Sequence, residues 1–154
     1  MTAPPFQRDI PPTAAGLAAA SQALADWLGA RGAPQAGIGR VELVLEEVVM
    51  NVIMHGSPAE APARIRLAAS ATPGACELEL HDNGPAFDPS TAPPRRDGAA
   101  LDQDRPGGLG LVLLRRYARD LRYTRLAGGN QLRLSIPYQP QTPGFPLPPP
   151  GTLR

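Results

Sequence analysis

Lysine is absent from the 154-residue sequence, so all 15 of its basic residues are arginines. This absence excludes a lysine as a phosphate ligand or as a Schiff-base nucleophile. Cysteine occurs once, at Cys76, which excludes an internal disulfide bond and a cysteine-based metal cluster. No uninterrupted apolar run reaches the roughly 18 residues that a membrane span requires, and Met1–Pro5 carries no signal-peptide pattern. We therefore expect a cytoplasmic protein that does not bind a membrane.

The balance of charge is close to neutral. The 15 basic and 14 acidic residues give a formal net charge of +1, whereas proteins that bind nucleic acid directly usually carry a clear basic excess. The length of the chain suits one domain with a substantial core. We therefore expect a single domain that does not bind nucleic acid directly.

Apolar periodicity predicts both helices and strands along the chain. The clearest element is a helix over 40–55, whose apolar residues follow the i, i+3, i+4, i+7 pattern. Another helix, over 14–31, begins directly after Thr13, which is a suitable cap. The remaining predicted elements are an edge strand at 6–10, strands at 64–70 and 75–81 joined by a turn at 72–74, a helix over 109–118, and strands at 121–126 and 131–136.

Two long segments lie outside these elements. Residues 83–107 form an irregular stretch, and a loop of about 25 residues inside a compact domain is often a lid or a binding segment. Residues 137–154 contain seven prolines, and we expect an extended or disordered tail there after a folded domain of residues 1–136. The fold class is an α/β (α+β) two-layer sandwich, because hairpin connections predict a largely antiparallel sheet with helices on one face.

Three stretches carry residues that suit a ligand site, and the first is on the helix over 40–55. There Glu47, Asn51 and His55 are spaced four apart, so they form one row beside the apolar stripe. A carboxylate and a carboxamide at the edge of a buried face are costly unless they have partners. Taken alone, the row also fits a set of boundary residues without a function, and His55 fits a hydrogen-bonding residue at a helix end.

The second stretch is Asp82–Pro89, which breaks an alternating strand with a glycine and two prolines and leaves Asp82 at the strand end. The third is Arg105–Leu111, which leads glycines directly into a helix, where backbone N–H groups can point at phosphate oxygens. It is not a P-loop, because the spacing and the lysine are missing, and no strand precedes it as in a dinucleotide-binding motif. Each stretch is a weak signal by itself.

In this order, the three stretches resemble the GHKL (Bergerat-fold, histidine-kinase-like) ATPase superfamily. The matching features are Glu-x-x-x-Asn on a helix, Asp-x-Gly-x-x-Phe after a strand, and Gly-Leu-Gly-Leu at the start of a helix. Within the superfamily, residues 6–136 are most similar to the bacterial anti-sigma factor serine/threonine kinases. The resemblance implies a Bergerat fold: a mixed, mostly antiparallel sheet with helices packed on one face and an ATP lid, here at about residues 90–106.

The resemblance also implies roles for single residues. Asn51 would be a Mg²⁺ ligand, because an amide oxygen suits a hard cation that bridges ATP phosphates. Glu47 would be the general base that accepts the proton of a protein hydroxyl or orients a water molecule. Asp82 would accept a hydrogen bond from the adenine amino group, and Gly84 would leave room for the ring.

The phosphates of ATP would lie at the third stretch. The resemblance implies that Arg105 contacts a phosphate when the lid is closed. It also implies that four backbone N–H groups bind the phosphates, those of Gly108, Leu109, Gly110 and Leu111. The last strand departs from the family pattern, since Arg133 occupies the place of a threonine that completes the adenine pocket. Ser135 lies on the same face of the strand and could take its place.

The function that the resemblance implies is an ATP- and Mg²⁺-dependent serine/threonine-protein kinase that acts as an anti-sigma factor switch. It would phosphorylate a small anti-sigma factor antagonist and sequester a sigma factor or comparable effector. Two alternatives stay open: a catalytically silent ATP-binding interaction module, and a detached histidine-kinase catalytic domain that serves a separate phospho-acceptor protein. Glu47 favours the kinase, because a silent module has no use for a general base. A homodimer also stays open.

Overall fold

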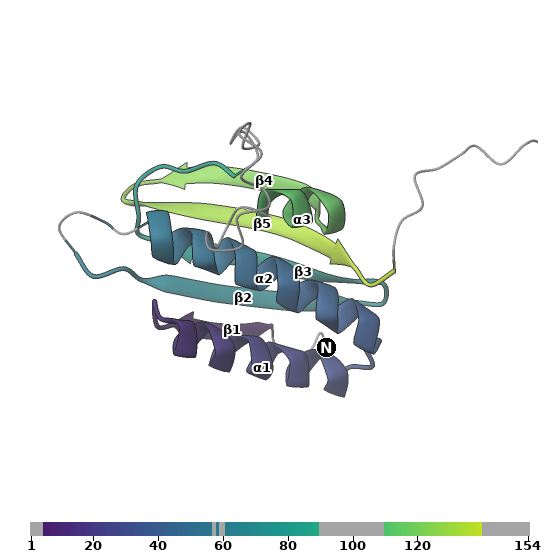
Figure 1. Cartoon of the computed structure of the whole chain (residues 1–154). Coiled ribbons are helices and arrows are strands. Elements are labelled where there is room, and N and C mark those ends of the chain that lie inside the picture. The colour runs from purple at the N-terminus through teal and green to yellow at the C-terminus, as the bar shows by residue number, and fades with distance from the viewer. Residues whose placement is uncertain (1–4, 57, 59–60, 90–109, 140–154) are drawn as a thin grey trace, which may run out of the picture.

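The computed structural model describes residues 5–56, 58, 61–89 and 110–139. Within these ranges the chain forms helices and strands that Figure 1 labels in chain order. They are β1 (Phe6–Ile10), α1 (Ala14–Ala30), α2 (Gln35–His55), β2 (Ile65–Thr72), β3 (Ala75–Asp82), α3 (Gly110–Tyr117), β4 (Arg119–Leu126) and β5 (Gly129–Pro137). None of the helices in the described ranges is long and apolar enough to cross a membrane.

The strands form one 5-stranded sheet in the order β1-β2-β3-β5-β4, and each neighbouring pair is antiparallel. The helices lie on one face of this sheet, with α2 between α1 and α3 (Figure 1). This arrangement confirms the predicted two-layer sandwich and the edge position of β1. The predicted cap is confirmed as well, because Oγ1 of Thr13 accepts a hydrogen bond from the backbone N–H of Gly16 at 3.0 Å.

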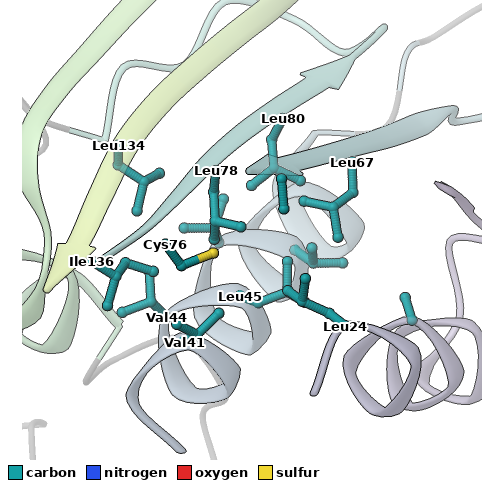
Figure 2. Packing of buried hydrophobic residues seen from close by; sticks show 14 of the residues in the cluster. Leu24, Val41, Val44, Leu45, Leu67, Cys76, Leu78, Leu80, Leu134 and Ile136 are labelled. Carbon is teal, nitrogen blue, oxygen red and sulfur yellow. The ribbon is translucent and has the colours of Figure 1, made fainter. Parts of the chain in front are cut away.

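The core lies between the sheet and the helices (Figure 2). Leu24 of α1, Leu45 of α2 and Leu78 of β3 point into it, and each is at most 2% exposed. Cys76 of β3 belongs to the same cluster. Burial, with a smaller contribution from the Glu77 carboxylate, raises the pKa of its thiol to about 12. The thiol therefore stays protonated and packs as an apolar group.

The start of α2 differs from the prediction. The sequence predicts a start at Arg40, and this prediction is wrong, because the helix begins at Gln35. The sequence predicts a break over 32–39, a segment that contains glycines and a proline, and both lower helix propensity. Gly37 has a packing role instead: a Cβ at this position would lie 2.6 Å from Cβ of Tyr138. The helix therefore contains a glycine where another part of the core passes close to its backbone.

The end of the folded part also differs from the prediction. β5 runs through Pro137, and the Tyr138 side chain is 5% exposed. The backbone N–H of Tyr138 donates to the carbonyl of Gly74 at 3.0 Å. The folded part therefore extends beyond residue 136, because Tyr138 closes the core against α2. Residues 140–154 and the predicted lid at 90–106 lie outside the described residues.

Candidate functional site

A recess opens where the C-terminal half of α2 approaches the ends of β3, β4 and β5. Its empty volume, the open mouth included, is about 520 Å³. Apolar side chains predominate in its wall, and a small number of polar groups accompany them, as is usual for organic ligands. The described residues that line it are Val48, Asn51, Val52, His55, Gly56, Leu80, Asp82, Pro85, Phe87, Pro89, Tyr123, Asn130 and Leu132.

Two of the predicted site residues meet at this recess from different elements. Asn51 comes from α2, and Asp82 comes from the end of β3. Among the described residues, no side chain or backbone group hydrogen-bonds to the amide of Asn51, so its oxygen is available to a ligand. His55, one turn further along α2, is exposed and also lines the recess.

Asp82 is the last residue of β3, and only one of its two carboxylate oxygens accepts hydrogen bonds from described residues. The residue lies opposite Asn130 of β5 in the sheet. Its Oδ1 accepts two hydrogen bonds, one from the backbone N–H of Gly84 at 2.8 Å and one from Nδ2 of Asn130 at 2.9 Å. No hydrogen bond reaches Oδ2 in the part of the chain that the structure describes. The strand therefore presents one fixed oxygen and one oxygen that can accept a hydrogen bond from a ligand.

The loop after β3 packs backbone to backbone against the end of α2. A Cβ at Gly84 would lie 2.0 Å from the carbonyl oxygen of Gly56, the residue that follows α2, so no side chain fits there. Asn83 anchors the same loop on its other side: Nδ2 donates to the carbonyl of Pro62 at 2.8 Å, and Oδ1 accepts from the N–H of Arg64 at 2.7 Å. The absence of a side chain at Gly84 thus lets the loop after β3 pack directly against the end of α2. The predicted room for a ring at Gly84 stays a prediction.

Tyr123, Arg125 and Asn130 form a hydrogen-bonded group next to Asp82 that the sequence reasoning missed. Nδ2 of Asn130 donates to Oδ1 of Asp82 and, at 2.9 Å, to the carbonyl of Pro85. Its Oδ1 accepts from the hydroxyl of Tyr123 and from Nη1 of Arg125, the latter at 3.3 Å. An amide has two donor hydrogens and two acceptor lone pairs, so the hydrogen-bonding capacity of Asn130 is used within the protein.

The prediction that Ser135 could replace the family's threonine in the adenine pocket is wrong. Leu132 faces the recess, and side chains alternate along a strand, so Arg133 and Ser135 point to the opposite face of the sheet. Nε of Arg133 lies 3.2 Å from Oε2 of Glu79, an ion pair on that face. The polar residue of β5 that faces the recess is Asn130, and counting in steps of two from the apolar residues of the strand would have identified it.

Glu47 does not line the recess, although it is one turn before Asn51 on α2. It lines a groove between α1 and α2, beside Leu43 and Met50. Its Oε2 is buried and has no hydrogen-bond partner among the described residues. Burial raises the pKa of the Glu47 carboxyl, and the Glu46 carboxylate adds to the rise. Glu47 is therefore a better proton acceptor than an ordinary surface glutamate.

The third stretch of the sequence is described only in part. α3 begins at Gly110, so Gly110 and Leu111 are its first residues, and backbone N–H groups at that end of a helix have no partner within it. This position suits the predicted contact with phosphates. Arg105, Gly108 and Leu109 lie outside the described residues, and their roles stay predictions.

No group of three or more histidine, cysteine, aspartate or glutamate side chains within the described residues could hold a metal ion. Mg²⁺ does not need such a group when it is carried by a nucleotide, because it keeps several waters and takes further ligands from the phosphates. One amide oxygen from the protein, such as that of Asn51, suits this kind of coordination. The described residues therefore fit a Mg²⁺ ion that arrives with ATP.

The antiparallel sheet with helices on one face, and the recess beside the end of α2, are the features of an ATPase domain of the histidine kinase type. The family model described as "Histidine kinase-like ATPase domain" matches residues 10–136. The chain belongs to this family. An ATPase domain implies ATP as its ligand.

Individual relatives refine this assignment. The chain is similar to the serine/threonine-protein kinase BtrW of Bordetella bronchiseptica, with 34% identity over 100 residues, 65% of this chain and 70% of the relative. It resembles the RsbU and RsbW domains of Rv1364c from Mycobacterium tuberculosis, with a TM-score of 0.61 and 20% identity, covering 87% of this chain and 32% of that structure. It also resembles the histidine kinase domain of the blue-light activated histidine kinase EL346 from Erythrobacter litoralis, with a TM-score of 0.50 and 22% identity, covering 80% of this chain and 60% of that one. This chain thus spans less than two thirds of either structure, and the two likenesses show the fold alone.

Proposed function

We propose that this protein is an ATP-dependent serine/threonine-protein kinase that acts as an anti-sigma factor switch in the cytoplasm. The proposal rests on α2, where Asn51 faces the recess and Glu47, one turn earlier, holds a carboxyl oxygen without a partner among the described residues. Phosphoryl transfer to a hydroxyl needs a ligand for the metal–nucleotide complex and an acceptor for the hydroxyl proton. The relative named as a serine/threonine-protein kinase supports the same class of reaction.

The nucleotide is bound in this proposal with its base in the recess. Oδ2 of Asp82, which no described residue uses, accepts a hydrogen bond from the adenine amino group. Asn51 gives one oxygen to Mg²⁺, and the ion neutralises part of the charge on the phosphates. The proposed phosphate contacts are the backbone N–H groups of Gly108, Leu109, Gly110 and Leu111 and the side chain of Arg105.

The protein substrate is a small anti-sigma factor antagonist, and the second partner is a sigma factor or comparable effector that the protein sequesters. Glu47 accepts the proton of the serine or threonine hydroxyl of the antagonist. Its place in the groove between α1 and α2, on the outer side of the helix layer, supports contact with another protein. A homodimer is compatible with this proposal.

A catalytically silent ATP-binding interaction module is the second candidate. One observation favours it: Glu47 lines the groove between α1 and α2, and the residues that line the recess do not include it. A silent module would use the recess to bind ATP and the groove to bind a partner protein, and it would not need a proton acceptor.

The variant Glu47→Gln separates the two candidates. Glutamine keeps the shape of the side chain but cannot act as a base, so transfer of labelled phosphate from ATP to the antagonist should fall by about 10²- to 10⁴-fold. ATP affinity, measured by calorimetry, should stay unchanged. The matched control is Glu77→Gln, because Glu77 is an exposed carboxylate on β3, away from α2, and should be dispensable. If the wild-type protein binds ATP and the antagonist but transfers no phosphate, the silent module is the correct function.

A further inference from the structure

The buried amide of Asn130 is the centre of a small polar network. Asn130 is 5% exposed, at the end of β5 that pairs with the end of β3. Hydrogen bonds join it to Asp82 and Pro85 on one side and to Tyr123 and Arg125 on the other. A buried polar group with all of its hydrogen bonds made has little freedom to move, because each rotation would leave a donor or an acceptor unsatisfied.

This network determines which oxygen of Asp82 can meet a ligand. The two oxygens of a carboxylate are chemically equal, and rotation of the group exchanges them. Nδ2 of Asn130 and the N–H of Gly84 both donate to Oδ1, at 2.9 and 2.8 Å, which favours one orientation. Oδ2 is then the oxygen that no described residue engages, and its direction is fixed by the strand pairing of β3 with β5.

The same network also occupies the carbonyl groups next to Asp82. Nη1 of Arg125 donates to the carbonyl of Gly84 at 2.7 Å, and Nδ2 of Asn130 donates to the carbonyl of Pro85. These backbone acceptors are therefore already paired within the protein. A ligand that enters this end of the recess meets Oδ2 of Asp82 as an oriented acceptor that no described residue engages.

We propose that Asn130 is a positioning residue for base selection: it holds Asp82 so that the recess prefers a purine with an amino group at position 6. Asn130 acts through Asp82 and need not touch the base itself. Tyr123 and Arg125 support it by holding its Oδ1. This inference rests on the proposed function, because it assumes that the base of a nucleotide occupies the recess.

Two nucleotides provide the test: ATP, and the triphosphate of purine riboside, which has the same ring and phosphates but lacks the 6-amino group. Calorimetry with the full chain should give a preference of the wild type for ATP of about 10-fold or more, as expected for a hydrogen bond to a charged group. Asn130→Ala should weaken ATP binding by about 5- to 20-fold and leave binding of the purine riboside nucleotide unchanged, so that the preference is lost. Tyr123→Phe, which keeps the ring and removes the hydroxyl, should reduce the preference by a smaller factor.

The control is Gln131→Ala, since Gln131 lies on the opposite face of β5, where it donates to Glu79 at 2.8 Å, and it should not change the preference. If Asn130→Ala weakens both nucleotides equally, the residue has only a structural role and the inference is wrong, while the base site stands. If Asn130→Ala does not fold, Tyr123→Phe decides in the same way. A wild type that binds both nucleotides equally well would overturn the proposed base site and this inference together.

Discussion

Two carboxylates near α2 have different surroundings, and these surroundings suit them to different tasks. Oδ1 of Asp82 accepts two hydrogen bonds, which fix the position of the carboxylate. Oε2 of Glu47 is buried without a partner among the described residues, and burial raises the pKa of that carboxyl. The first carboxylate is suited to recognition and the second to proton transfer, a division that environment alone can produce.

Replacing Asp82 tests the recognition role. Asp82→Asn removes the charge and offers an amide hydrogen as readily as an oxygen, so ATP affinity should fall by about 5- to 150-fold, or about 1–3 kcal/mol. GTP should bind weakly to the wild type, because the oxygen at position 6 of guanine is an acceptor that faces another acceptor. Asp9→Asn, at an exposed position on β1, is the control and should bind ATP normally. Equal ATP affinity of Asp82→Asn and wild type in calorimetry would remove Asp82 from the base site.

The sequence predicts some of these residues and misses others for a physical reason. Asn51 and Asp82 each belong to a short local pattern, a helical row and a strand end, and the structure brings both to the recess. Asn130 reaches the recess because β5 pairs with β3 in a register that joins residues 48 positions apart. Such a register depends on the whole sheet, and local sequence does not reveal it. The position of Tyr123 at the recess depends in turn on the pairing of β4 with β5.

At the scale of elements, α2 connects the core with the candidate site. Its N-terminal part packs on Tyr138, its middle fills the core, and its C-terminal end lines the recess. The sequence predicts the middle of the helix well, because apolar periodicity reports burial directly. The prediction from sequence fails at the N-terminal part of α2, because glycine has low helix propensity. The contact that requires glycine at position 37 is made by Tyr138, which is distant in the sequence. Tertiary packing therefore overrides propensity at this end.

A pair of glycine substitutions in α2 tests this explanation. Gly37→Ala should destabilise the protein by about 1–3 kcal/mol, because its Cβ would lie 2.6 Å from Cβ of the buried Tyr138. Gly39→Ala is the matched control: outside the backbone of α2, no described residue has an atom within 4 Å of a Cβ there, so the gain in helix propensity should stabilise the protein by about 0.5–1 kcal/mol. Urea unfolding measures both changes. The same sign for the two variants would contradict the packing explanation.

At the scale of the whole molecule, one face of the sheet is covered by helices (Figure 1). The opposite face carries charged side chains. On the second face Glu79 pairs with Arg133 and contacts His81, with distances of 3.2 and 2.7 Å. The hydrogen bond from His81 is the main cause that lowers the pKa of the Glu79 carboxyl, with smaller contributions from Gln131 and Arg133. Glu79, His81, Gln131 and Arg133 thus form one paired group on this face. The apolar core lies on the covered face.

Truncation tests where the folded unit ends. A chain that ends at Gln139 should unfold at the same temperature as the full chain, because the sequence predicts an extended tail beyond this point. A chain that ends at Pro137 also lacks Tyr138, whose side chain is 5% exposed. Loss of such a large buried side chain should cost about 3 kcal/mol and lower the melting temperature by roughly 10 °C. A large loss already in the chain that ends at Gln139 would show that the tail packs on the domain.

The pairing of β3 with β5 has a consequence for the lifetime of the protein in the cell. The β2–β3 and β4–β5 hairpins each close between strands that are neighbours in sequence, whereas the β3–β5 seam joins two distant parts of the chain. Residues of both strands line the recess, so in the proposed function a chain in which this pairing has opened could not bind the base. Bound ATP therefore raises the free energy of unfolding. When the ATP concentration is 100 times the dissociation constant, the increase is about 2.7 kcal/mol. The ATP concentration in the cell would then determine how often the β3–β5 pairing opens and exposes the chain to proteases. A fall in ATP would shorten the half-life of the protein as well as slow its reaction.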